Sequence, residues 1–95
     1  MAEEEGTEVA PEDLLEAIRR MKVADLLLST ISTTAQLGYA KLEPDSRDLR
    51  QARLAIESMK ALLPVLEGEV AKEVLDEFGQ LLANLQLAYA KAVGE

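Results

Sequence analysis

The residues best spaced to do chemistry are three carboxylates in the C-terminal third of the chain. Glu73, Asp76 and Glu77 stand at i, i+3 and i+4, a spacing that places side chains on one helix face and can hold a metal ion between helices. The chain has no histidine and no cysteine, so it lacks the commonest general base, the commonest metal ligand and any thiolate nucleophile. We therefore expect these acids to form a solvated helix face, and we expect no catalytic residue, no metal site and no cofactor.

Three arginines in the middle of the chain could bind an anion. Arg47, Arg50 and Arg53 follow one another at intervals of three, which fans them across about 120° of a helix and does not concentrate their charge as a phosphate or nucleic-acid site requires. We therefore expect no nucleic-acid partner. An inter-helix pocket for a small anion stays open as an alternative, and its candidate residues are Thr30, Thr34, Arg53 and Tyr89.

The charge of the chain is unevenly distributed. The protein has 95 residues and a net charge of −8, and residues 1–13 hold six acidic residues and no basic one. The other 82 residues, with 12 acids and 10 bases, are nearly neutral. This pattern predicts a disordered acidic tail over residues 1–10 in front of a single domain over residues 11–95.

The longest uncharged run is too short and too polar to cross a membrane. It covers residues 26–40, and one third of it is serine or threonine. Spanning a bilayer takes roughly 20 mostly apolar residues. The acidic N-terminus also lacks the basic and apolar regions of a signal peptide. We expect a cytoplasmic protein with no membrane partner.

Helical periodicity and the positions of proline predict an all-α fold. We expect helices over about residues 11–41, 46–63 and 69–93, the second of them capped by Asp45 or Ser46. No alternating β-branched run and no Asn-Gly or Asp-Gly turn indicates a strand or hairpin. The expected architecture is a three-helix bundle with a long first helix and antiparallel second and third helices.

One apolar seam runs along the long first helix. Its residues alternate three and four apart, which is typical of a helix that packs against another: Met21, Ala24, Leu28, Ile31, Ala35 and Gly38. The two shorter helices cannot cover the whole first helix, so we expect this association seam to complete the fold by homodimerisation. The alternative is a break near Lys22, with residues 12–20 folded back as a separate short helix.

Two leucines lie outside the predicted core rows. Leu54 and Leu87 point away from the apolar faces of the second and third helices. Single exposed leucines are common. If both lie on one surface, they predict a patch for a protein partner or the other half of the dimer contact.

Three segments of the chain follow a recognisable order. The first is a serine-led apolar helix ending in Leu-Gly, which Ser29–Gly38 matches. The second is an Asp-Leu-x-x-Ala-x-x-x-Ile segment, matched by Asp48, Leu49, Ala52 and Ile56. The third is a closing Leu-x-x-x-Tyr segment, matched by Leu85 and Tyr89. In this order they resemble the small bacterial proteins catalogued as domain of unknown function 1844, over about residues 23–93. That family usually has a Lys-Thr-x-Gly-Asn turn, of which Gly68 alone is kept, and an arginine where Gln86 stands. The resemblance implies a bacterial, cytosolic, helical protein and no established activity.

The sequence as a whole predicts a non-catalytic helical interaction or oligomerisation module, not an enzyme, with a second copy and a further protein as its partners. The alternative is a dimeric small-molecule-binding protein or a helical enzyme. The predicted helices resemble the outline of the all-helical chorismate mutases, whose sites hold carboxylates with arginines and a lysine. Only Arg53 fits that site, because Thr30 stands at the mid-helix arginine position if Lys41 is taken as the lysine.

Overall fold

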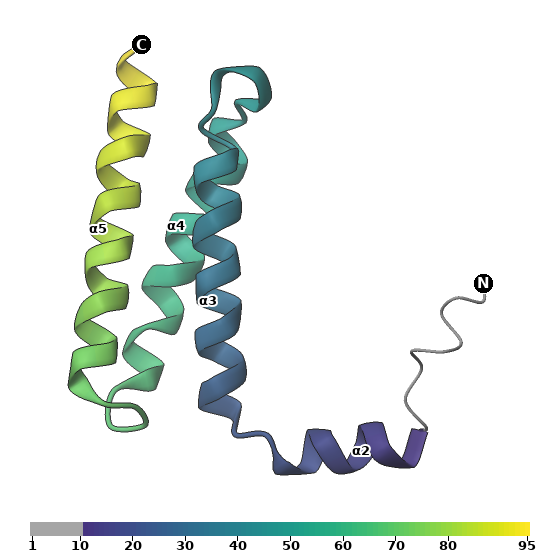
Figure 1. Ribbon diagram of the computed structural model, residues 1–95. Coiled ribbons are helices and arrows are strands. Elements are labelled where there is room, and N and C mark those ends of the chain that lie inside the picture. Colours follow the sequence, from purple (N-terminus) through teal and green to yellow (C-terminus); the bar gives the residue numbers. More distant parts are fainter. Residues whose placement is uncertain (1–10) are drawn as a thin grey trace.

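The protein is all-helical over the residues that its structure describes. The computed structural model describes residues 11–95, so the predicted acidic tail lies outside the described residues. Within that range there is no strand beyond a single bridge between Glu67 and Val70, which confirms the all-α prediction. The elements, in chain order, are α2 (Pro11–Arg20), α3 (Val23–Ala40), η1 (Pro44–Ser46), α4 (Leu49–Leu62), η2 (Pro64–Leu66) and α5 (Lys72–Gly94) (Figure 1).

Helices α3, α4 and α5 pack side by side, and each runs opposite to the one before it (Figure 1). We call residues 23–95 the body. Its core is built from residues spaced three and four apart on each helix, which is the pattern of an amphipathic helix with one buried face. The fully buried side chains of largest volume are Ile31, Met59, Leu66 and Leu85. No helix within residues 11–95 is long and apolar enough to cross a membrane.

Local hydrogen bonds fix the connection between α3 and α4. Asp48 caps α4 by accepting a hydrogen bond from the Gln51 amide at 3.2 Å, so the prediction that Asp45 or Ser46 caps this helix is wrong. Both of those residues belong to η1, and the Ser46 hydroxyl donates instead to the Ala40 carbonyl at 2.6 Å. The reason is that Pro44–Ser46 form the separate short helix η1, so α4 begins only at Leu49.

The Arg47 side chain joins this connection to the end of α5. Its guanidinium donates to the Leu42 carbonyl at 2.8 and 3.1 Å and to the Glu95 carboxylate at 2.9 Å. Arg47 is therefore engaged within the fold, and it does not form a common anion site with Arg50 and Arg53.

The single long first helix expected over residues 11–41 is wrong. The chain breaks at Met21 and Lys22, and Lys22 is extended, with φ −92° and ψ 140°. Charges favour separate helices here: Arg19 and Arg20 lie in the last turn of α2, and Asp25 lies in the first turn of α3. Each of these charges suits the dipole of its own helix end, an interaction that one continuous helix would not provide.

Helix α2 does not fold back on the body either. All ten of its residues are exposed, and it extends sideways from the foot of α3 (Figure 1). The break near Lys22 is thus the alternative that the structure shows, but with the short helix held away from the body.

The break can be tested with proline at Val23. Val23 is the first residue of α3, where the backbone amide has no partner inside the helix, and the extended Lys22 before it suits the residue preceding a proline. Because Val23 is 71% exposed, its side chain contributes little to the core. We expect Val23→Pro to change the free energy of unfolding, measured with urea, by less than about 0.5 kcal/mol.

The matched control is Thr33→Pro, at an exposed position inside α3. It should lower the free energy of unfolding by about 3 kcal/mol or more, because proline removes a helical hydrogen bond and clashes with the preceding turn. A similar loss for both variants would show that the helix is continuous through residues 21–22.

Candidate association surface

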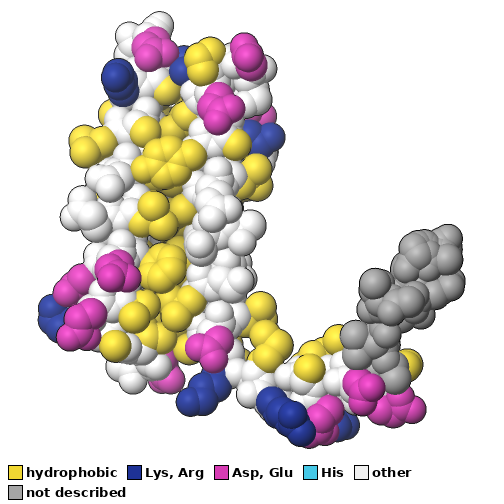
Figure 2. Space-filling model, viewed as in Figure 1, with side chains coloured by type: hydrophobic (Ala, Val, Ile, Leu, Met, Phe, Trp, Pro, Cys, Tyr) yellow, Lys and Arg dark blue, Asp and Glu magenta, His cyan; other side chains and the backbone are white. Residues whose placement is uncertain are grey.

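Helix α2 presents an apolar face that no other part of the described chain covers. Leu14, Leu15 and Ile18 share one side of the helix, and Met21, directly after its last residue, follows Ile18 at a spacing of three. Their exposed fractions are 52, 51, 53 and 50%. We call these four residues the α2 face. Figure 2 shows apolar side chains along α2 and at the corner where it meets the body.

A helix as short as α2 needs support from a packed surface. Its ten residues make a rod about 15 Å long. Isolated helices shorter than about 12–15 residues are marginal in water, and in proteins they are stabilised mainly by packing of their apolar face. The ion pairs inside α2, from Glu16 to Arg19 at 3.4 Å and to Arg20 at 3.3 Å, are exposed and contribute little. The α2 face is therefore the strongest candidate for contact with a partner.

The outer side of α3 continues this candidate surface without any charge. Leu26, Thr30, Thr33 and Leu37 are all exposed, and their spacing places them on one side of the helix. The Thr30 hydroxyl donates to the Leu26 carbonyl at 2.9 Å, so it needs no outside partner. We call these four residues the α3 outer face. A shallow hollow of about 310 Å³ lies along it, lined by Ser29, Thr30, Thr33, Thr34 and Leu37.

Most of the predicted association seam lies inside the body. Ile31, Ala35 and Gly38 are buried, and Ala24 and Leu28 are partly buried against the same core. A Cβ atom at Gly38 would lie 3.0 Å from the Ala55 Cβ and 3.0 Å from Leu85 Cδ2. The seam from Ala24 to Gly38 therefore packs against helices of its own chain, and only Met21, which belongs to the α2 face, stays open at half exposure.

The two leucines proposed as a partner patch are exposed but do not share a hollow. Leu54 and Leu87 have exposed fractions of 56 and 70%. Leu54 lines a small hollow on α4 with Arg50, Arg53 and Glu57, and Leu87 on α5 is not part of it. Sequence reasoning missed the more extensive apolar surface of α2, although the signal was present: four large apolar residues on one side of a short segment.

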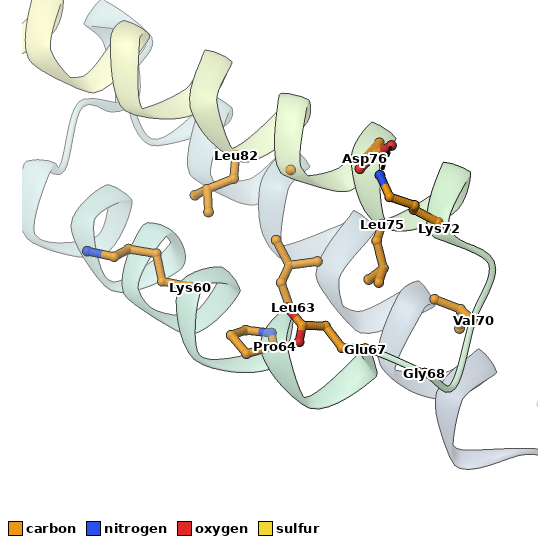
Figure 3. Close-up of a pocket in the computed structure, with 11 residues that line it drawn as sticks. Lys60, Leu63, Pro64, Glu67, Gly68, Val70, Lys72, Leu75, Asp76 and Leu82 are labelled. Carbon is orange, nitrogen blue, oxygen red and sulfur yellow. Dashed lines mark hydrogen bonds and ion pairs between the residues drawn. The ribbon is translucent and has the colours of Figure 1, made fainter.

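A cavity of about 770 Å³ opens between α4 and α5 (Figure 3). Apolar side chains form much of its wall, notably Leu63, Val70, Leu75 and Leu82. The two lysines of its rim are each beside an acid: Lys72 lies 3.4 Å from Asp76, and Lys60 lies 3.7 Å from Glu57. The cavity thus offers an apolar interior rather than a free positive charge.

The residues proposed for an inter-helix anion pocket are not gathered in one place. Thr30 and Thr34 line the hollow on α3, whereas Arg53 lines the hollow on α4 beside Glu57. Tyr89 packs against the core. No group of three or more His, Cys, Asp or Glu residues within residues 11–95 is arranged to hold a metal ion.

Comparison of the chain with protein-family models, with curated proteins and with solved structures yields no match. A functional conclusion therefore depends on the geometry described above.

The internal packing of the seam predicts opposite effects for two glycine substitutions. Gly38→Ala should destabilise the protein by about 1–3 kcal/mol, because the new methyl group would press against the Ala55 Cβ, which cannot move without α4. The control is Gly79→Ala, also inside a helix, where nothing lies within 4 Å of the added Cβ. Gly79→Ala should stabilise by about 0.5–1 kcal/mol through helix propensity alone. Urea unfolding of the full chain measures both, and a stabilising Gly38→Ala would contradict the close packing of α3.

Proposed function

We propose that this protein is a non-catalytic helical interaction module, in which a three-helix body is completed by homodimerisation. The observation that carries the proposal is the α2 face: an amphipathic helix is held away from the body, and its three large apolar side chains and the following Met21 are all about half exposed. A monomer of this shape keeps apolar surface in water, and covering that surface is the main driving force of association.

The free energy available at the α2 face is substantial. Complete burial of a leucine, isoleucine or methionine side chain contributes about 1.5–3 kcal/mol relative to exposure, and each of the four is already half covered. In a two-fold dimer, the same face is buried on both copies. The sum over both copies is of the order of several kcal/mol, which then has to offset the loss of translational and rotational freedom.

The interface that we propose includes the foot of α3 as well as α2. Stable interfaces bury about 1,200–2,000 Å² in total, more than a pair of rods about 15 Å long can supply. Val23 and Leu26, which are 71 and 51% exposed, extend the apolar area beyond α2. The lack of charge on the α3 outer face supports the same proposal, because charged residues are depleted in the cores of interfaces.

A second candidate function is the binding of a small ligand between α4 and α5. The cavity of about 770 Å³ has the size of common ligand pockets. Its apolar wall and paired lysines favour an apolar ligand over the anion first considered. A Gly79→Phe variant, whose ring would enter the cavity mouth, should lose binding of an apolar fluorescent probe without a change in association.

A bacterial, cytoplasmic setting is also a proposal. It is supported by the resemblance to domain of unknown function 1844, carried by Ser29–Gly38 and by Asp48, Leu49, Ala52 and Ile56. These residues lie in α3, at the N-cap of α4 and within α4, so the resemblance concerns the body and not α2.

The proposed association predicts the mass of the protein in solution. Light scattering should give twice the chain mass of 10.4 kDa for the full-length protein. A Leu14→Glu, Ile18→Glu variant should give the mass of one chain, because four buried carboxylates per dimer raise the dissociation constant at least about 30-fold. Its circular dichroism should show that the body remains helical, since α2 has no buried residue.

The matched control is a Leu54→Glu, Leu87→Glu variant, which adds the same charge at two exposed leucines outside α2. It should keep the dimer mass. Loss of the dimer in this control alone would place the contact on α4 and α5 instead of α2, and a monomeric full-length protein would contradict self-association.

A further inference from the structure

We propose that α2 pairs with α2 of a second copy in an antiparallel arrangement, across a two-fold axis at the level of Glu16 along the helix. This inference rests on the proposed function and names the partner of the α2 face and its orientation. Three observations carry it: the order of charges along α2, their positions on either side of Glu16, and the direction in which α2 leaves the body.

The charges of α2 are divided between its two ends. Acidic Glu12 and Asp13 lie in the first turn, and basic Arg19 and Arg20 lie in the last turn. Leu14 and Ile18 are equally far from Glu16, so reversing the helix places apolar residues on apolar residues and acids on bases. A segment with this symmetry is complementary to itself only when the two copies run in opposite directions.

The same charges lie on the polar half of α2, two on each side of Glu16. At about 100° per residue, Glu12 and Arg19 lie on one side of Glu16 and Asp13 and Arg20 on the other, all more than about 100° from the middle of the α2 face. When two helices pack face to face in opposite directions, sides of the same kind lie next to each other. Glu12 is then on the same side and at nearly the same level as Arg19 of the second copy, and Asp13 as Arg20 of the second copy.

A parallel pair would bring like charges to the same level. In that arrangement Glu12 and Asp13 lie level with the same acids of the second copy, and Arg19 and Arg20 lie level with the same arginines. Exposed ion pairs contribute little affinity, but like charges placed near one another discriminate against a wrong arrangement. The charges thus select the orientation, while the apolar α2 face supplies the affinity.

Glu16 holds the two arginines within each helix. It lies on the side of α2 away from the α2 face, and its carboxylate oxygens are 3.4 Å from Arg19 and 3.3 Å from Arg20. This carboxylate therefore need not enter the interface, and the two guanidinium groups stay near the C-terminal end of α2, where they suit the helix dipole.

Among residues 11–95, the position of α2 leaves room for a second copy. Helix α2 leaves the foot of α3 sideways, so these residues enclose an open angle between α2 and the body (Figures 1 and 2). A two-fold pair would place the second α2 in this angle, next to Val23 and Leu26, which are exposed at the foot of α3. Each copy would both supply a helix and receive one, as in any isologous interface.

Charge reversal tests the orientation with variants that complement each other. Glu12→Lys, Asp13→Lys makes both ends of α2 basic, and Arg19→Glu, Arg20→Glu makes both ends acidic. Alone, each variant should dimerise at least about tenfold more weakly than the unmodified chain at low salt, with partial recovery at high salt. An equimolar mixture should form a dimer with one chain of each kind, at least about tenfold more tightly than either variant alone.

The mixture separates charge pairing from damage to the helix. Reversed charges at the ends of α2 also oppose the helix dipole, and mixing cannot repair that effect. Recovery of the dimer in the mixture therefore supports charge pairing between copies. Variants that dimerise as well as the unmodified chain, or a mixture that stays monomeric, would overturn the proposal.

Single cysteines test the register, and the protein has none of its own. Antiparallel pairing about Glu16 brings Pro11 of one copy next to Met21 of the other, whereas the two copies of Pro11 lie about 15 Å apart along the helices. A disulfide needs Cα atoms within about 7 Å. A mixture of Pro11→Cys and Met21→Cys chains should therefore form a mixed disulfide dimer, and neither variant alone should cross-link.

Failure of the inference and failure of the proposed function give different results. If Leu14→Glu, Ile18→Glu abolishes the dimer while Pro11→Cys cross-links with itself, α2 associates in a parallel arrangement, and only the antiparallel proposal is overturned. If the full-length protein is a monomer, both proposals are overturned.

Discussion

The close packing of α3 against α4 and α5 decides which side of α3 is buried and which side is exposed. At Gly38 the absence of a side chain lets Ala55 and Leu85 approach to a distance that a methyl group would already crowd. This contact commits the small and apolar side of α3 to the core, together with Ile31 and Ala35. The uncharged outer side of α3 and the whole of α2 stay exposed.

Because α3 is committed to the core, association and internal packing use different parts of the chain. The body buries its side chains without help from α2, which contributes no buried residue. A short helix with an apolar face is marginal by itself, so it is a segment whose order depends on what it touches. Residues 11–95 thus divide into a body with an internal core and a short helix that adds no residue to that core.

Local sequence signals predicted the body well and the region around residue 22 poorly. The apolar stripes of α4 and α5 and the proline that follows α4 lie where the pattern places them. No proline or glycine marks the break between α2 and α3, and the three-and-four spacing of apolar residues continues through it. Asp45, Ser46 and Asp48 are all good capping residues, and only the path of the chain after Pro44 decides that Asp48 caps α4.

The sequence by itself determined that the protein is helical and that it has no histidine and no cysteine. These properties depend on residue type and spacing, which are local. The tertiary structure alone decided which surface is left uncovered, because the seam of α3 could pack equally well on another copy or on its own chain. Its contact with Ala55 and Leu85 settles that choice, and the break at Met21 and Lys22 leaves α2 exposed beside the body.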